Sequence, residues 1–401
     1  MAITAIQGSV DHQNELTIRR PIDVSTEISR AEADNTPFLL FSQGLDFASC
    51  DQEKFQWQER GDETLFVTAN GAVADTVTTL VLDAGDGNLL VKNDMLFNPT
   101  TGEHMLVVSI TNSTTVEVAR NLNGLTTPAI VDNAVLYLEA SAMEEGSKAR
   151  DVISIQPEDN YNYIQTSREG WKVSGRLQNV KHYGVDPLTF VRDDKLRSFL
   201  RKLERRYLLG ARSKTTIGSV GNVTTSGGLK HFMDDSSGCV QSDQSGVGTW
   251  NRANFNAMLK DAFAVGSSHK VALVGWDVLN ILGDFVWDKL QIVDMAQKTL
   301  GVGIRRYECD YGILDLMPHK LFTAANARGG LGLDGEMWVF DPANIKRRGL
   351  PSRSEITLFT GPAGDQLQDT DEDATHQELW CEDGLEVRHP ETMYRGYGIS
   401  A

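Results

Sequence analysis

The chain has 401 residues, 40% of them hydrophobic, and a formal net charge of −17 at neutral pH. This length predicts two or three domains, or one domain with an insertion, and the acidic surplus opposes any general attraction to nucleic acid or anionic lipid. Because no run of 18 apolar residues occurs and no apolar leader follows Met1, we expect neither a membrane-spanning helix nor a secretory signal.

The first 36 residues predict an extended arm, since they show little apolar periodicity. Such an arm buries too little apolar surface to offset its ordering entropy, so we expect it to be ordered by lying on a neighbouring molecule. The apolar stretch Asn35–Leu45 is its expected anchor. Beyond it, Lys54–Glu59 alternates as a half-buried strand does, and Glu63–Ala69 is its expected partner across Gly61.

From Thr76 to about Glu145 the sequence is rich in strands and poor in helices. Turn signals recur roughly every 7 to 11 residues, and the pieces between them, such as Met105–Ile110 and Thr115–Arg120, are β-rich. This pattern predicts a small β barrel or sandwich. We expect it to be inserted into a longer two-stranded excursion, which resumes as the strands Val152–Gln156 and Asn162–Val173.

The segment from Asp186 to Gly210 predicts a long helix. Asp186 can accept hydrogen bonds from the first-turn amides, Pro187 loses no hydrogen bond at the first position, and Gly210 can end the helix in the left-handed conformation. At about 1.5 Å per residue the helix is a rod of roughly 35 Å. Three- and four-residue steps predict one buried stripe, made of Leu196, Phe199, Leu200, Leu203 and Tyr207.

The other face of this helix is predicted to be charged and mainly basic. It would either follow nucleic acid or face acidic groups of the same or a neighbouring subunit, and the acidic chain favours the second interpretation. The residues assigned to this face are Arg192, Lys195, Arg197, Arg201, Lys202, Arg205 and Arg206, with Asp193, Asp194 and Glu204 among them.

The second half predicts a loop-rich segment and then an α/β domain. Ser213–Gly248 is rich in Gly, Ser and Thr, which is typical of long, mobile or partner-ordered loops. We then expect a helix capped by Thr249 and ending at Gly266, a strand Val271–Gly275, a helix from Asp277 to Trp287, and the strands Ile304–Glu308, Gly312–Leu316, Met337–Phe340, Glu355–Thr360, Gln377–Glu382 and Leu385–Arg388.

No pattern in the sequence predicts catalytic, cofactor-binding or metal-binding residues. Gly301-Val302-Gly303 lacks the third glycine of a dinucleotide loop, and no nucleophile elbow or metal-binding histidine pair occurs. The alternating Asp369, Asp371 and Asp373 fail as a calcium loop because Ala374 and Trp380 stand where glycine and a carboxylate belong. The scattered cysteines favour free thiols; they are Cys50, Cys239, Cys309 and Cys381.

The order of these parts resembles that of tailed-bacteriophage major capsid proteins with the HK97 fold, and more narrowly the SU10-type major capsid protein family. The segments that carry the resemblance are PIDVSTEISRAEADNTPFL, KFQWQE, SREGWKVSGRLQNV, DPLTFVRDDKLRSFLRKLERRYLLGARS, YECDYGILDLMPHKLF, MWVFDPANIKRRGLP and ELWCEDGLEVRHPETMYRGYGI. The resemblance covers nearly the whole chain.

This resemblance implies an α+β, HK97-like fold with an inserted β domain. Its implied parts are an N-terminal arm (1–48), an E-loop-like excursion (49–75 and 146–180), the insertion (76–145), the spine helix of the P-domain with the Gly/Ser-rich loop (181–250), the A-domain (251–350) and strands returning to the P-domain (351–401). The chain lacks the long charged N-terminal scaffolding region of some relatives, which implies a separate scaffold or none.

The function that the resemblance implies is self-assembly into the icosahedral head shell of a phage. Expected partners are hexamers and pentamers of the same chain, non-specifically packaged double-stranded DNA, and scaffold, portal and decoration proteins, with no membrane, no cofactor and no catalysis. We expect assembly in the host cytoplasm and residence in the virion. The alternatives are an encapsulin-like nanocompartment shell and a carbohydrate- or receptor-binding β module on a scaffold, although Phe97 and Tyr137 are the few aromatic residues in 76–145.

Overall fold

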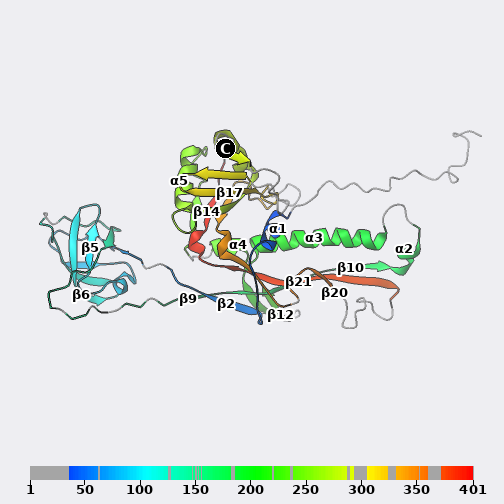
Figure 1. Ribbon diagram of the computed structural model, residues 1–401, viewed down its shortest axis with the longest axis horizontal. Helices are drawn as coiled ribbons and strands as arrows, with labels where there is room; N and C mark the ends of the chain where they lie inside the picture. Colours follow the sequence, from blue (N-terminus) through cyan, green and yellow to red (C-terminus); the bar gives the residue numbers. More distant parts are fainter. Residues whose placement is uncertain are drawn as a thin grey trace, which may run out of the picture. The chain divides into compact units, whose positions relative to one another are not determined.

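The computed structural model contains two compact units, unit 1 (Met1–Trp57 and Asn160–Ala401) and unit 2 (Gln58–Asp159) (Figure 1). The residues that it describes are 36–61, 64–124, 128–146, 148–149, 151, 153–154, 156–181, 186–218, 221–234, 238–286, 290–292, 305–323, 331–351, 353–359 and 372–400. Residues 1–35 of the predicted N-terminal arm therefore lie outside the described residues, as do Asp369 and Asp371. No helix of the described residues is long and apolar enough to span a membrane.

Unit 2 is a six-stranded antiparallel barrel with its own core. Its strand order is β3-β8-β5-β6-β7-β4, and a bridge between Ala69 and Leu82 links the ends of this order, which closes the sheet. Alternate residues such as Val67, Leu96 and Leu136 point inward and are buried. The strands are β3 (Phe66–Thr68), β4 (Thr79–Val81), β5 (Met95–Asn98), β6 (Glu103–Asn112), β7 (Thr115–Ala119) and β8 (Val135–Leu138), with the 3-10 helix η2 (Asp86–Leu89).

The predicted partner of Lys54–Glu59 was wrong. This segment is β2 (Lys54–Glu59), and it pairs with β9 (Glu158–Tyr163), whereas Phe66–Thr68 pairs with β8 of the barrel. The cause is burial: Phe55 and Trp57 of β2 join the core of unit 1, whereas Val67 joins the core of unit 2. The compact unit spans 58–159, and its barrel strands run from Phe66 to Leu138.

Unit 1 holds a five-stranded sheet that gathers segments from both ends of the chain. Its path is β1-β19-β21-β10, with β20 also paired to β21. The strands are β1 (Phe47–Ser49), β10 (Gln165–Ser174), β19 (Ile345–Gly349), β20 (Thr357–Phe359) and β21 (Ala374–Val387). The helix α3 (Pro187–Leu209) packs on β10 and β21, as Figure 1 shows, and the helices α1 (Pro37–Gln43), α2 (Gly175–Asn179) and α4 (Leu229–Asp234) lie in the same unit.

A second sheet of unit 1, seven-stranded, forms the α/β part. Its order is β13-β22-β18-β14-β17-β16-β15, with α5 (Arg252–Ala262) and α6 (Trp276–Val286) beside it. The strands are β13 (Val240–Asp243), β14 (His269–Val274), β15 (Leu290–Ile292), β16 (Arg305–Cys309), β17 (Gly312–Pro318), β18 (Met337–Phe340) and β22 (Tyr394–Tyr397); the 3-10 helices η5 (Pro342–Asn344) and η6 (Pro390–Thr392) flank the last strands. The strands predicted at Val271–Gly275 and Met337–Phe340 are confirmed.

The expected loops at Ser213–Gly248 are largely ordered elements. Among its described residues β11 (Ser213–Ile217) and β12 (Gly221–Thr225) form a hairpin, and α4 and β13 follow. Gly228 serves close approach, since a Cβ on it would lie 2.6 Å from the carbonyl oxygen of Tyr207 at the end of α3, whereas Gly218, Gly246 and Gly248 have open space at that position.

Two further predictions need correction. The cap of α5 is Asn251, whose side chain accepts from two first-turn amides, instead of Thr249. The two strands predicted at Gln377–Glu382 and Leu385–Arg388 are one strand, β21, because the buried Asp383 keeps its Asp-Gly pair extended. The two sheets exchange late segments of the chain, since β19 lies in the five-stranded sheet and β22 in the seven-stranded one.

Candidate functional site

The buried ion pairs and hydrogen bonds of the site are arranged around the long helix α3. Its start is as predicted: Asp186 accepts from the amide of Thr189 at 3.0 Å and Pro187 occupies the first turn. The predicted stripe is also confirmed, with Phe199, Leu203 and Tyr207 buried and Leu196 and Leu200 packed against the same core. This apolar stripe fixes which face of α3 meets the sheet.

The end of α3 differs from the prediction. Gly210 has φ −53°, so it is not left-handed, and the chain leaves the helix in an extended conformation. Glycine is required there for space, because a Cβ would lie 2.4 Å from the carbonyl oxygen of Ser226. Gly228 donates its amide hydrogen bond to Gly210 at 2.8 Å, so the segment after β12 closes the helix end.

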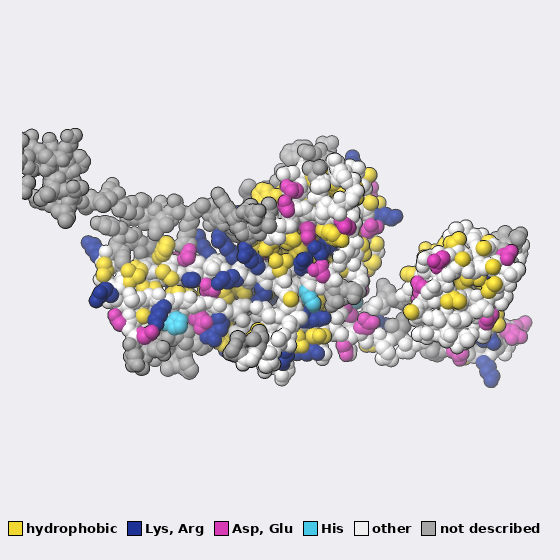
Figure 2. Space-filling view, turned by 180° about the vertical axis from the view of Figure 1, so that it is seen from behind, with side chains coloured by type: hydrophobic (Ala, Val, Ile, Leu, Met, Phe, Trp, Pro, Cys, Tyr) yellow, Lys and Arg dark blue, Asp and Glu magenta, His cyan; other side chains and the backbone are white. Residues whose placement is uncertain are grey.

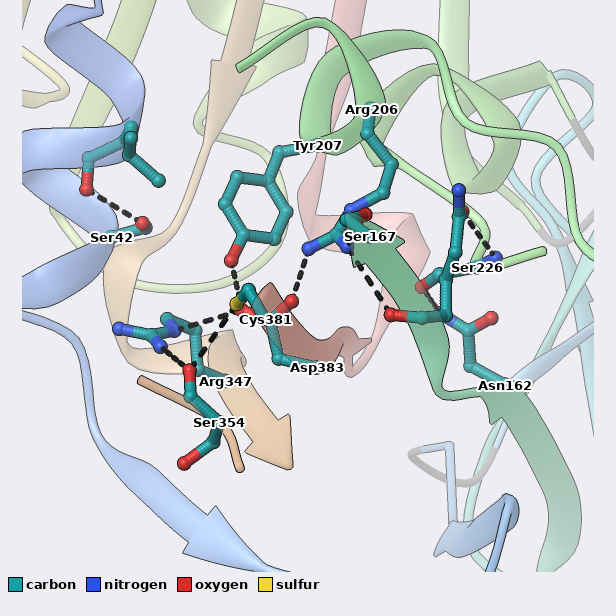
Figure 3. A network of polar contacts seen from close by, with 12 residues as sticks. Ser42, Asn162, Ser167, Arg206, Tyr207, Ser226, Arg347, Ser354, Cys381 and Asp383 are labelled. Carbon is teal, nitrogen blue, oxygen red and sulfur yellow. Dashed lines mark hydrogen bonds and ion pairs between the residues drawn. The ribbon is translucent and has the colours of Figure 1, made fainter. Parts of the chain in front are cut away.

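Asn162 of β9 ties this helix end to the sheet. It lies beside Ser226, as Figure 3 shows. Its buried side-chain amide donates to the carbonyls of Leu385 (2.7 Å) and Gly227 (3.1 Å), and its oxygen accepts from the Gly227 amide at 2.8 Å. The base of the β2–β9 strand pair is thereby fixed to both β21 and the end of α3.

Several charges of α3 are paired with acidic groups of the same chain. Lys195 lies 3.3 Å from Glu169 of β10, and Lys202 donates to the other oxygen of the same carboxylate. Partial burial alone would raise the pKa of Glu169, but the hydrogen bonds from Lys202 and Lys195 outweigh it and hold that pKa below its usual value. These pairs fit the interpretation that α3 faces protein, and they occur within one subunit.

Arg206 and Glu204 do not belong to the exposed face to which we assigned them. Arg206 and Tyr207 donate to the two carboxylate oxygens of Asp383 in β21, and Arg347 of β19 lies 3.5 Å from the same group (Figure 3). Asp383 is fully buried. One carboxylate therefore joins α3 to two neighbouring strands, and removing any partner would leave a buried charge underpaired.

The groups around Asp383 are structural in their chemistry. Burial raises the pKa of the Tyr207 hydroxyl, and the neighbouring Asp383 raises it further. Burial, followed by Asp383, raises the pKa of the Cys381 thiol to about 12. A cavity of about 380 Å³ adjoins the network, with Leu39, Arg347 and Cys381 in its lining. Because this thiol stays protonated at neutral pH, the cavity offers a poor nucleophile.

Glu204 clamps the start of the ordered chain onto α3. One of its carboxylate oxygens accepts from the Phe38 amide (2.8 Å) and from Nε2 of His319 (2.6 Å), and the other accepts from the Leu39 amide (2.5 Å). Nδ1 of His319 accepts from the Leu321 amide at 3.1 Å, so the ring proton lies on Nε2, toward Glu204. Both side chains are 0% exposed.

This clamp supplies the cap that α1 lacks. Thr36 makes no side-chain cap, and Phe38 and Leu39 are first-turn amides of α1, so the Glu204 carboxylate provides the acceptors for this helix start. The sequence holds a signal for Glu204 that we missed: it stands four residues after Leu200 and three before Tyr207, on the apolar stripe itself. An acid at such a position has to be paired.

A second buried charge, Lys270 of β14, holds the α/β part together. Its ammonium donates to the carbonyls of Ala262 (2.7 Å), Val265 (2.7 Å) and Thr392 (2.6 Å). The first two lie at the end of α5, so this cation completes the helix terminus and connects it to the segment before β22.

No metal centre is formed by the part of the chain that the structure describes, where no three His, Cys, Asp or Glu side chains are grouped to hold an ion. The four cysteines are free thiols. What the geometry does provide is a long helix joined by buried charges to strands from distant parts of the chain. A long helix on a sheet that gathers both ends of the chain, together with an α/β part, is the arrangement expected above for an HK97-like capsid protein.

The chain belongs to the SU10 major capsid protein family, whose model matches residues 5–400. A major capsid protein of Pseudomonas phage PaMx41 is 32% identical over 108 residues, which are 27% of this chain and 25% of that protein. The chain thus matches about a quarter of the length of that relative.

Solved capsid structures are similar to this chain at low sequence identity. The capsid of the native GTA particle has a TM-score of 0.47 at 9% identity, covering 97% of this chain and 98% of the other. The cyanophage A-1(L) capsid gives 0.47 at 12% identity (96% and 98%), and the capsid of Myoviridae phage XM1 gives 0.44 at 13% identity (98% and 100%).

Proposed function

We propose that copies of this chain close into the icosahedral head shell of a phage, around double-stranded DNA. The family match over residues 5–400 carries this proposal. The mechanism is geometric, because one fold must meet copies of itself in slightly different surroundings. Hexamers and pentamers of the chain would form the shell, with scaffold, portal and decoration proteins as further partners, and assembly would take place in the host cytoplasm.

The positions of the buried charges support a distinction between a rigid frame and segments that reach neighbouring subunits. Asp383 and Glu204 hold α3, β19, β21 and α1 as one body, so we expect this frame to keep its shape in every position of the shell. The arm (residues 1–35) and the β2–β9 excursion would reach neighbouring subunits, where many modest contacts add up to a stable particle. No catalytic step is required in this role.

DNA would be enclosed without a specific binding site. Lys195, Lys202 and Arg206 of α3 are already paired with acids of the same chain, which lowers the positive charge available to phosphates. Figure 2 shows Lys and Arg side chains on one face of unit 1, with Asp and Glu side chains among them. Arg192 and Arg197 are exposed on α3, and they are the positions at which to test DNA contact.

The experiment is expression of the chain with and without its scaffold and portal partners, followed by negative-stain electron microscopy. Closed shells of uniform size support the proposal. Arg192→Gln with Arg197→Gln should leave the yield of shells and the mass of packaged DNA unchanged. Normal empty shells with lost packaging in this double variant would instead assign the exposed face of α3 to DNA.

A further inference from the structure

The outer surface of the β barrel carries a row of ring side chains that the sequence did not bring together. Phe66 of β3 lies opposite Tyr137 of β8, Tyr137 lies opposite Phe97 of β5, and Phe97 lies opposite His104 of β6. Directly opposed residues on adjacent strands point to the same side of a sheet. Their neighbours Val67, Leu96 and Leu136 point inward, so the four rings face outward.

This row is available to a ligand. Tyr137 is 48% and Phe66 45% exposed, although full exposure of an aromatic ring to water is unfavourable. Phe97 and His104 are half-buried and lie against one another, with ring centroids 4.8 Å apart and planes tilted by 35°. The result is a band of ring side chains running across four strands.

Hydrogen-bonding groups lie at one end of the band. Nδ1 of His104 is 3.1 Å from a carboxylate oxygen of Glu139, and both side chains are about one-third exposed. The Tyr137 hydroxyl adds a donor and acceptor within the row. Aromatic rings followed by a carboxylate and an imidazole match a sugar, whose C–H groups pack on rings while its hydroxyls donate to the carboxylate and to Nε2 of the imidazole.

The charge of unit 2 selects among possible ligands. Residues 58–159 contain sixteen Asp and Glu against five Lys and Arg, a net charge of −11 out of −17 for the whole chain. Anionic ligands such as nucleic acid, sulfated sugars or acidic lipids would therefore be repelled. A neutral oligosaccharide would not be repelled.

The size of the band also favours a small ligand over a protein. With about 200 Å² for each ring, roughly half of it exposed on two of them, the row and the adjoining Val135 offer on the order of 300–400 Å². A stable protein interface covers about 800 Å² on each partner. In Figure 2 the hydrophobic side chains visible on unit 2 are interspersed with polar ones, without one large apolar face.

We propose that the row Phe66, Tyr137, Phe97 and His104, with Glu139, binds neutral oligosaccharides. A single site of this size would bind weakly, and repetition over a shell would convert weak sites into firm attachment. In this respect the inference rests on the proposed shell function. It assigns unit 2 to attachment at a glycan-bearing surface.

The test uses the full-length chain, assembled and fluorescently labelled, on an array of neutral oligosaccharides and of uronate- or sulfate-bearing ones. We expect binding to neutral oligosaccharides only. Tyr137→Ala and Phe66→Ala should each lower single-site affinity about tenfold, the loss of roughly one stacking contact. Tyr137→Phe keeps the ring and should stay within about threefold of the parent, and Val131→Ala, at an exposed apolar position outside the row, should bind normally.

Three outcomes would overturn the inference: no neutral oligosaccharide is bound, Tyr137→Ala binds as well as the parent, or the ring variants change self-association while leaving sugar binding intact. Circular dichroism and micrographs of each preparation separate these results from misfolding. If no shells form at all, the shell proposal fails, and the array can still be read with unassembled chain at higher concentration.

Discussion

Glu204 offers a sharp test of the buried frame, because one carboxylate accepts three hydrogen bonds. In Glu204→Ala the Phe38 amide, the Leu39 amide and Nε2 of His319 lose their acceptor together. Each unsatisfied buried donor costs about 1–3 kcal/mol, so we expect a loss of about 4 kcal/mol in the free energy of unfolding. Glu204→Gln retains one accepting oxygen but turns an amide toward a backbone donor, and we expect a loss of about 2–3 kcal/mol.

The assay can be restricted to unit 1 by the distribution of tryptophan. All seven tryptophans lie outside residues 58–159, so urea unfolding followed by tryptophan fluorescence reports unit 1 alone. Asp193→Asn is the matched control, since this acid lies on the same helix and its side chain is 56% exposed. It should change stability by less than about 0.5 kcal/mol.

Hydrogen exchange gives the local readout. The Phe38 and Leu39 amides should exchange faster in Glu204→Ala than in the parent, because their acceptor is gone, while amides of the central strand β14 follow only the global change. Unchanged exchange at these two amides, together with unchanged urea midpoints, would refute the assignment of Glu204 as the clamp of α1.

Three further predictions concern unit 1. Arg206→Met should cost about 3 kcal/mol by leaving Asp383 underpaired, whereas the exposed Lys202→Met should cost less than about 1 kcal/mol; equal urea midpoints would contradict this. Asp315→Asn should lower stability by about 1–2 kcal/mol at pH 7. Burial alone would raise the pKa of Asp315, but hydrogen bonds from Arg306 and His269 hold it below its usual value, so its contribution is complete above the ordinary pKa of aspartate and is lost as pH falls through the lowered pKa. A parent–variant difference that does not begin to shrink as the pH is lowered below the ordinary pKa of aspartate would be inconsistent with this. Deleting residues 1–36 should leave the urea midpoint of unit 1 unchanged and abolish shell closure; shells of normal yield would refute the role of the arm.

Local signals were sufficient to predict α3, since Asp186, Pro187 and the stripe through Tyr207 act within a few turns of one another. Local signals failed where a residue far away in the sequence determines the structure. Glu204 meets amides 165 and 166 residues away, so its place on the apolar stripe could indicate burial but could not identify its partners. The Asp383-Gly384 pair is typical of a turn, yet Arg206 and Tyr207 hold it inside one long strand.

The ring row on the β barrel could not be predicted from the sequence, because it depends on how the strands are paired and on their register. Phe66 was assigned to the excursion, but it pairs with β8 of the barrel. This pairing depends on which hydrophobic core Val67 enters, and that is decided by tertiary packing. The ring row follows only from three cross-strand registers taken together. Glycine-rich Ser213–Gly248 was expected to be loops, since composition does not distinguish flexible glycines from those needed for close approach, such as Gly228.

The most direct measurement is the mass of the particles formed by the purified full-length chain, by light scattering with electron microscopy on the same samples. Shell formation predicts closed particles containing many copies, at a threshold concentration or on addition of scaffold protein. Single molecules of 44.2 kDa at every concentration, with and without such partners, would contradict the account.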